Sequence, residues 1–325
     1  MWRGMNKIKY IFRDNKVAYD LLRFFYTVFV HPERLQKKTI KNADKILYII
    51  RPDSEDCVEG LMSLFIHTMV KIDYARRMGY IPYVDYLHYK TQYYNGKDNV
   101  WEYYFSQPFS VESSDIRESK NMILSGVTIR NPEDKTLFRD SIFYDREKCR
   151  KCYNLIWGNI DLSKDVKMLV EREMTFIDIE KCIGVYIRGT DYIWLKPTGE
   201  HVQPSIAQLC EKIDEFMKKH EGSSVFLVTE DQRYYDELRG RFGDKILTVT
   251  FDSFINNYNG KDFLSKSRVL NPDKKKRGMD YLTKIVLLSR CKYFVGAITM
   301  GSIAAYAMNG GRYEDEYVFD LGRYP

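Results

Sequence analysis

The sequence has 325 residues, of which 44% are hydrophobic and 30% are charged. Such a composition is typical of a globular protein, and the length favours two domains because single hydrophobic cores seldom grow so large. The formal net charge is +6, yet residues 1–41 alone hold ten Lys or Arg against three acidic side chains. The remaining chain is therefore close to neutral, which argues against a nucleic acid-binding protein, whose folded domains need a basic face.

Six cysteines occur, at positions 57, 149, 152, 182, 210 and 291. They are too scattered for a disulfide framework, and no signal-peptide pattern precedes them, so we expect reduced thiols in the cytoplasm. Cys149 and Cys152 form a C-x-x-C pattern. No second pair stands at zinc-site spacing, and we therefore expect structural thiols and no metal site.

Residues 1–41 form a basic, amphipathic segment with an apolar stretch at 17–30. Asp20 and Arg23 interrupt this stretch, which is shorter than the roughly 20 apolar residues that a helix needs to cross a bilayer. Two interpretations remain open. The aromatic side chains could lie on the anionic inner face of a membrane, as a peripheral contact, or they could pack on the protein itself.

Residues 42–175 are expected to form an N-terminal α/β domain. An apolar strand pattern at 45–52 is followed by a polar loop, and Gly60 opens a helical pattern that stops near Gly79. A second strand pattern at 81–86 completes a strand–helix–strand unit. Backbone N–H groups at the start of such a helix can bind a phosphate, which makes Gly60 a candidate binding residue.

The rest of this domain has a weaker pattern. Residues 87–108 are polar and rich in aromatic side chains, which could form the acceptor side of a cleft or simply pack the loop down. Further on, we expect a short strand at 122–124 and helices at 145–157 and 163–174. We place the domain boundary at 175/176.

Residues 176–325 are expected to form a second α/β domain. Strand and helix patterns alternate along it, which predicts a mostly parallel sheet with helices on both faces. The expected strands are 183–187, 224–231, 245–251 and 292–297, and the expected helices are 204–220, 233–242, 279–289 and 301–308.

Polar residues follow three of these strands. They are found at 188–191, at 229–231 and at 296–302. Ligands of a parallel α/β sheet bind beyond the carboxyl ends of its strands, so we expect the three segments to line one crevice. Arg188 carries a planar, permanent charge that suits phosphate oxygens, although an Arg that pairs with a surface carboxylate would give the same local pattern. At the third segment, hydroxyls and the N–H groups of the following helix could bind phosphate together.

The order of these motifs resembles that of the GT-B glycosyltransferases of the fucosyltransferase superfamily. This group includes α1,6-fucosyltransferases, bacterial nodulation fucosyltransferases and protein O-fucosyltransferases. The similarity is best over 183–310, where residues 188–191 match the R-x-T-D signature. The family usually has His-x before this signature, where this chain has Tyr186-Ile187. The first half of the chain resembles bacterial polysaccharide-assembly members of this group, through residues 60–65, 78–86 and 99–105.

The resemblance implies a GT-B-like fold, with two Rossmann-like domains facing a central cleft. It implies transfer of a sugar, most readily fucose from GDP-fucose, to a glycan or lipid-linked oligosaccharide in bacterial surface polysaccharide synthesis. Arg188 would contact the β-phosphate and Asp191 would support its loop. The residues expected to bind the nucleotide sugar are Gly60, Arg188, Gly189, Thr229, Glu230, Asp231, Asp280, Thr299, Gly301 and Ser302.

Charge stabilisation of the departing diphosphate should be the largest catalytic contribution in such a transfer. The sequence has no convincing D-x-D metal motif, and Arg188 with helix N-termini could replace a cation, so we expect metal-independent, inverting transfer without a cofactor. The general base stays open among Asp85, Glu102, Glu200, His201 and His67. The expected catalytic set is Arg188, Asp191, Glu200 and His201. The alternatives are a different nucleotide sugar as the donor, or a catalytically silent nucleotide- or carbohydrate-binding protein.

Overall fold

The computed structural model describes residues 44–325 except 53–58, 111–115, 117–118, 126–136, 257, 259, 262 and 265–271; of residues 1–43 it describes only 17, 21, 24, 25, 28 and 29. The predictions for residues 1–41 therefore lie almost wholly outside the described residues. Within the described part of the chain, no helix combines the length and the apolar character needed to cross a bilayer.

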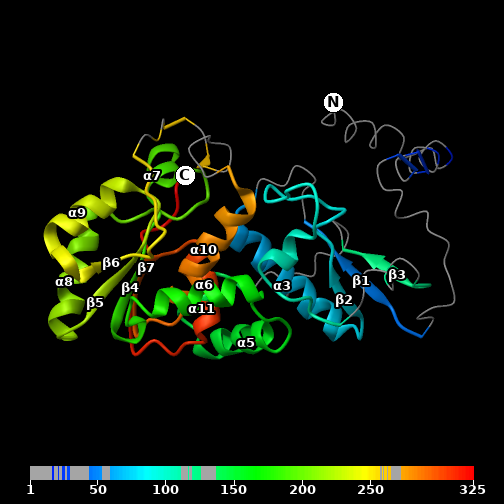
Figure 1. The fold of residues 1–325 in the computed structure, drawn as a ribbon, viewed down its shortest axis with the longest axis horizontal. Helices are drawn as coiled ribbons and strands as arrows, with labels where there is room; N and C mark the ends of the chain where they lie inside the picture. The colour runs from blue at the N-terminus through cyan, green and yellow to red at the C-terminus, as the bar shows by residue number, and fades with distance from the viewer. Residues whose placement is uncertain are drawn as a thin grey trace.

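A three-stranded parallel sheet forms the first half of the molecule (Figure 1). Its strands are β1 (Leu47–Ile50), β2 (Ile81–Val84) and β3 (Met122–Leu124), in the order β2-β1-β3. Helix α3 (Leu61–Arg77) connects β1 to β2, as the sequence predicts. All four side chains of β1 are buried, which agrees with its unbroken apolar run.

The second half holds a five-stranded parallel sheet in the order β6-β5-β4-β7-β8 (Figure 1). Strands β4 (Cys182–Tyr186) and β7 (Tyr293–Ala297) pair at its centre, and every residue of both is buried. Parallel strands covered on both faces need such continuous apolar sequences. The other strands are β5 (Ser224–Val228), β6 (Ile246–Leu247) and β8 (Asp315–Phe319).

Helices cover both faces of this sheet. Along β4, Ile183 and Val185 point to the face covered by α8 (Ile206–Lys219) and α9 (Gln232–Phe242). Tyr186 points to the opposite face, which is covered by α10 (Lys274–Leu288) and α11 (Met300–Asn309). This period of two along the strand divides the residues between two hydrophobic clusters.

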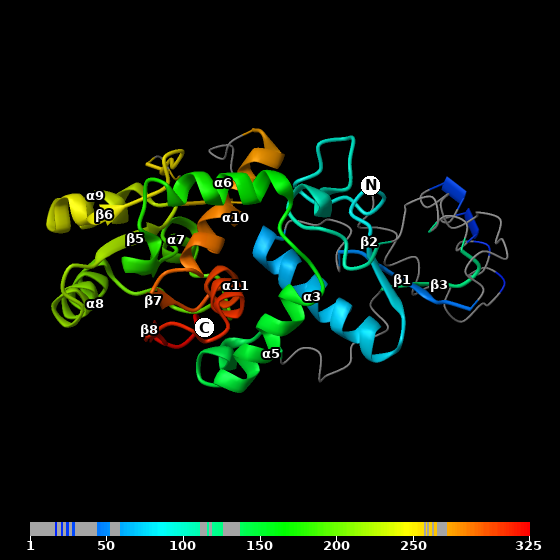
Figure 2. The ribbon, with the colours of Figure 1, turned by 60° about the horizontal axis from the view of Figure 1, so that its bottom comes forward.

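The two halves share one hydrophobic cluster. Helix α3 packs against α11, and α5 (Arg146–Trp157) and α6 (Lys164–Met174) pack against α11 and α10 (Figure 2). The cluster includes Phe65 of the first half and Phe294 of the second, both fully buried. The boundary at 175/176 stays a prediction, since residues on either side of it contribute to the same core.

Several elements differ in extent from the sequence patterns. The strand predicted at 245–251 is only Ile246–Leu247, because Glu173 of α6 accepts the backbone N–H of Thr250 at 2.6 Å and so withdraws it from sheet pairing. Helix α10 begins at Lys274 instead of 279, because the side chain of Asp273 caps it. Strand β8 and the short helix α7 (Thr190–Leu195) have no counterpart among the predicted elements.

Candidate functional site

The polar segments after β4 and β5 meet, as expected for neighbouring parallel strands. The backbone N–H of Gly189 donates to Oε1 of Glu230 at 3.0 Å, and that of Thr190 donates to Oδ2 of Asp231 at 3.0 Å. The Thr190 hydroxyl also donates to Oε1 of Glu230 at 2.7 Å. Thr229 supports the same turn, since its hydroxyl oxygen accepts the N–H of Asp231 at 3.2 Å.

Gly189 has no room for a side chain. A Cβ atom built there would lie 2.2 Å from Oδ2 of Asp231 and 2.3 Å from its Cβ atom. Such distances are far inside van der Waals contact. The close approach of the two strand ends therefore requires glycine at this position.

Arg188 lies between two carboxylates and above an aromatic ring. Its Nη2 atom is 2.5 Å from Oδ1 of Asp191, and its Nε atom is 3.4 Å from Oε1 of Glu230. Its guanidinium carbon lies 5.0 Å from the centre of the Tyr192 ring. The Nε atom is buried without a hydrogen-bond partner, because the contact with Glu230 is close enough for charge attraction but not a hydrogen bond.

Arg188 keeps its positive charge despite its burial. Burial disfavours its charged form, but the carboxylates of Glu230 and Asp191 more than compensate and raise the pKa of Arg188 well above its ordinary value. Asp191 is itself buried and accepts the N–H of Leu264 at 3.1 Å. Burial likewise opposes the ionised form of Asp231, yet hydrogen bonds from Arg233 and from the N–H of Thr190 lower its pKa below the ordinary value.

The third polar segment forms the N-terminus of α11. Thr299 caps this helix, and its hydroxyl oxygen accepts the N–H groups of Gly301 and Ser302 at 3.1 and 3.3 Å. In return, the Ser302 hydroxyl oxygen accepts the N–H of Thr299 at 2.9 Å. This capping box already occupies two of the N–H groups that the sequence offers to a phosphate.

Two tyrosine hydroxyls meet at the start of this helix. The hydroxyl oxygens of Tyr186 and Tyr281 are 3.0 Å apart. A Cβ atom at Gly301 would lie 2.3 Å from the first and 2.5 Å from the second, so both phenols rest directly on the first turn of α11. The sequence patterns do not single out these tyrosines, although Tyr186 stands two residues before Arg188.

Gly60 lies in the first half, at the start of α3. It precedes α3 as its N-terminal cap, and the N–H of Leu61 donates to the hydroxyl oxygen of Tyr93 at 3.1 Å. Arg277 of α10 lies 5.4 Å from the centre of the Tyr93 ring. Burial and Tyr186 raise the pKa of Tyr281, and Tyr93 is near enough to contribute to the same shift.

The segment that carries Glu200 and His201 is fixed by the last residues of the chain. The N–H of Gly199 donates to the carbonyl of Tyr324 at 2.9 Å, and the side chain of Arg323 donates to the carbonyl of Gly199 at 2.6 Å. Glu200 accepts a hydrogen bond from the hydroxyl of Tyr192 at 3.2 Å, which places it beside the ring under Arg188.

His201 pairs with a carboxylate outside the Arg188 cluster. Its Nε2 atom is 2.9 Å from Oδ2 of Asp140, which also pairs with Arg323. Burial raises the pKa of Asp140, but the contacts with His201 and Arg323 lower it further than burial raises it. The Nδ1 atom of His201 is buried without a partner. Asp140, which pairs with both His201 and Arg323, is thus a partner that the sequence did not reveal.

The remaining candidate bases make bonds within the first half. Asp85 pairs with Nδ1 of His88 at 2.8 Å, and Glu102 accepts a hydrogen bond from Gln107 at 2.8 Å. His67 lies 3.2 Å from Glu59. The roles predicted for these residues stay predictions.

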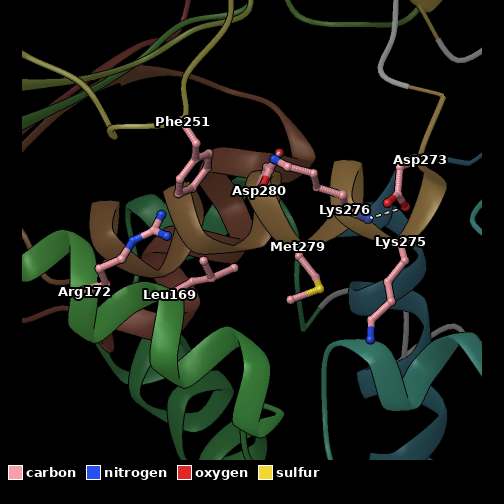
Figure 3. Close-up of a pocket in the computed structure, with 8 residues that line it drawn as sticks. All are labelled: Leu169, Arg172, Phe251, Asp273, Lys275, Lys276, Met279 and Asp280. Carbon is pink, nitrogen blue, oxygen red and sulfur yellow. Dashed lines mark hydrogen bonds and ion pairs between the residues drawn. The ribbon is translucent and has the colours of Figure 1, made fainter.

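Asp280 lies apart from the Arg188 cluster, beside a cavity of about 290 Å³ between α6 and α10 (Figure 3). It pairs with Lys276 at 2.5 Å, whereas the next residue, Tyr281, faces Tyr186. Apolar side chains form much of the cavity wall, and basic groups lie at its edge. The lining residues are Leu169, Arg172, Phe251, Asp273, Lys275, Lys276, Met279 and Asp280.

Among the described residues, no group of three or more His, Cys, Asp or Glu side chains has an arrangement that could hold a metal ion. Cys149 and Cys152 are buried free thiols, which donate to the carbonyls of Tyr306 and Leu137. These hydrogen bonds give the C-x-x-C pattern a structural role.

Two parallel α/β halves, with polar strand ends collected in the second, define the GT-B fold. Among solved structures, the fucosyltransferase NodZ from Bradyrhizobium has a TM-score of 0.51 and 16% sequence identity, over 86% of this chain and 96% of NodZ. The predicted resemblance to GT-B fucosyltransferases is thus confirmed at the level of the fold.

Two further solved structures of fucosyltransferases match most of this chain. A NodZ α-1,6-fucosyltransferase co-crystallised with GDP has a TM-score of 0.49 and 17% identity, over 81% of this chain and 91% of that chain. A mutant of Arabidopsis thaliana FUT1 in complex with GDP has a TM-score of 0.48 and 11% identity, over 94% of this chain and 79% of that chain. No protein-family model matches the sequence, and neither does any curated protein.

Proposed function

We propose that this protein is a glycosyltransferase that binds a nucleoside diphosphate sugar at Arg188, with GDP-fucose as the donor. The observation that carries the proposal is the partly buried guanidinium at the carboxyl end of β4, whose buried Nε atom has no hydrogen-bond partner. A buried donor without an acceptor is costly in a folded protein, and a phosphate oxygen would satisfy it. The fold shared with a fucosyltransferase supports this reading.

The proposed chemistry is inverting and metal-independent. Breaking the bond between the sugar and the diphosphate leaves an electron-poor sugar carbon and a diphosphate with increased negative charge. Arg188 would stabilise that charge in a site that excludes much of the water, which is the kind of contribution that is worth about 3 to 4 kcal/mol for an oxyanion donor. No cofactor is needed for this step.

The proposed acceptor is a glycan or a lipid-linked oligosaccharide of bacterial surface polysaccharide synthesis. We place the reaction in the cytoplasm at the inner face of the membrane, with residues 1–41 as the peripheral contact. The basic charge of that segment supports the placement, since anionic lipid surfaces attract clustered Lys and Arg.

Titration calorimetry with GDP, UDP and ADP tests the donor site. We expect GDP to bind most tightly, and we expect Arg188→Ala to weaken GDP binding by about 100-fold, because two or more charge-assisted hydrogen bonds are lost. Arg241→Ala is the matched control, since the largely exposed Arg241 of α9 forms an ion pair with Asp214 of α8 and makes no hydrogen bond or ion pair with the Arg188 cluster among the described residues. Failure of GDP to bind, or equal loss in both variants, would contradict the proposal.

A second candidate is a catalytically silent nucleotide-sugar-binding protein. It is favoured by one observation, namely that each of the five candidate bases already has a hydrogen-bond or ion-pair partner. Donor assays separate the two functions. Tight GDP binding together with no release of fucose from GDP-fucose, to water or to any glycan acceptor, would support the silent protein.

A further inference from the structure

Tyr186 and Tyr281 form a hydroxyl pair that no part of the proposed donor site yet uses. Tyr186 ends β4 and points to the α10–α11 face, where it is 2% exposed. Tyr281 comes from the middle of α10 and is partly exposed. Their hydroxyl oxygens are 3.0 Å apart, and the absence of a side chain at Gly301 makes the space that holds them.

The hydrogen bonds of this pair can be counted. In the hydrogen bond between the two phenols, one hydroxyl donates and the other accepts. The pair therefore has two phenolic hydrogens and uses one of them internally. When Tyr186 donates to Tyr281, the second hydrogen is on Tyr281, the more exposed member of the pair. It is then available to an acceptor outside the pair.

The charges around the pair explain why such a donor matters. Burial raises the pKa of Tyr186 and of Tyr281, while Arg188 opposes that shift in both, so the two phenols are neutral near pH 7. Arg188 itself is flanked by Asp191 and Glu230. A diphosphate that approaches Arg188 therefore meets a cation whose charge is largely offset, and it gains from neutral donors that bring no negative charge.

We propose that Tyr281 donates its phenolic hydrogen bond to the leaving diphosphate, and that Tyr186 is the positioning residue that holds it, anchored on the first turn of α11. This inference rests on the proposed donor site. In the step concerned, the bond between the sugar carbon and the β-phosphate oxygen breaks, and its electron pair stays on that oxygen. The acceptor hydroxyl oxygen forms the new bond to carbon and releases its proton to a base outside the pair. Tyr281 keeps its own proton throughout.

Loss of the Tyr281 hydroxyl should lower turnover much more than it weakens the binding of GDP. The negative charge on the diphosphate increases as the bond breaks, so a donor aimed at it acts mainly in the transition state. Tyr281→Phe should lower the kcat for release of fucose from GDP-fucose by about 100-fold, while KM and the Kd of GDP change by less than about threefold. Tyr186→Phe should lower kcat by about tenfold, because Tyr281 remains but is less well held.

Tyr313→Phe is the matched control. Tyr313 is a buried phenol that donates to the carbonyl of Leu288 at 2.9 Å, and it makes no contact with the Arg188 cluster among the described residues. Its loss should leave kcat unchanged. Phosphorus NMR of bound GDP adds a readout that needs no turnover: Tyr281→Phe should shift the β-phosphate resonance relative to the wild-type complex, and Tyr313→Phe should not.

The two proposals fail in different ways. If the wild-type protein does not bind GDP, the donor site itself is wrong. If GDP binds and Arg188→Ala weakens that binding as predicted, yet Tyr281→Phe changes neither the β-phosphate resonance nor kcat, the donor site stands and the role of the tyrosine pair is refuted. Equal losses in Tyr281→Phe and Tyr313→Phe would likewise refute it, by showing a general effect of removing a buried hydroxyl.

Discussion

At the residue scale, the donor site depends on how closely the ends of β4 and β5 approach each other. Arg188, Thr190 and Glu230 come together because adjacent parallel strands end at the same edge of a sheet. That proximity could be predicted from the sequence, since both strand patterns are clear. The Tyr186–Tyr281 contact could not, because it depends on the rotation of α10 over the sheet, and no local pattern fixes such a rotation.

Gly189 provides a test of this close approach. Gly189→Ala should destabilise the protein by about 1 to 3 kcal/mol, because the added Cβ would lie 2.2 Å from Asp231 and would force the strand ends apart. Urea unfolding followed by circular dichroism measures the change. It should also weaken GDP binding, because the loop that holds Arg188 shifts.

The control for that variant is Gly240→Ala. Gly240 lies inside α9, and a Cβ there meets no atom within 4 Å. Alanine is favoured over glycine in a helix interior, so this variant should be stabilised by about 0.5 to 1 kcal/mol. If both variants change stability in the same direction, the steric account of Gly189 is wrong.

At the element scale, most helices and strands follow the periodicity of the sequence, and the exceptions have tertiary causes. The sequence pattern of α3 predicts its extent well, because apolar residues begin directly after Gly60 and Gly79 follows shortly after the last helical residue. Strand β6 is shorter than its β-branched sequence predicts, because a carboxylate from α6 binds the backbone of residue 250. A bond between segments so distant in sequence leaves no signal in the local pattern.

Because the carboxylate of Glu173 makes these hydrogen bonds, we expect the stability of the protein to depend on pH. Burial alone would raise the pKa of Glu173, but hydrogen bonds from Thr250 and Arg172 hold it below the ordinary value. A lowered folded-state pKa contributes stability above the unfolded value of about 4.3, and this contribution is lost as the pH falls through the folded pKa. Glu173→Gln should therefore be less stable than wild type by about 1 to 3 kcal/mol at pH 7.

Urea unfolding at pH 7 and at pH 3 to 4 measures this difference. The gap between wild type and Glu173→Gln should narrow at the lower pH, where the wild-type carboxylate gains a proton. Glu171→Gln, on the exposed side of the same helix, should behave like wild type at both pH values. A gap that stays constant with pH would contradict the assignment to Glu173.

At the scale of the whole molecule, the sequence predicts the two α/β halves, but it does not predict the hydrophobic core that they share. Helices α5 and α6 precede the predicted boundary, yet they pack on α11 and α10 of the second half (Figure 2). Composition and periodicity indicate that a helix has an apolar face. They do not indicate which partner covers it.

The shared core predicts cooperative unfolding. Scanning calorimetry should show one transition whose calorimetric and van't Hoff enthalpies agree, because separating the halves would expose residues such as Phe65 and Ile285 that are fully buried in one cluster. GDP at 100 times its Kd should stabilise that single transition by about 2.7 kcal/mol. Two resolved transitions, with only the second moved by GDP, would show that the halves are energetically independent.

The order of strands in the second sheet has a consequence for biosynthesis. Strand β4 lies at the sheet centre, but its partner β7 leaves the ribosome on the order of 100 residues later. During that interval one hydrogen-bonding edge of an entirely apolar strand has no native neighbour, which favours association between nascent chains. We therefore expect recombinant yield of soluble protein to increase when translation is slowed by cooling or when chaperones are co-expressed.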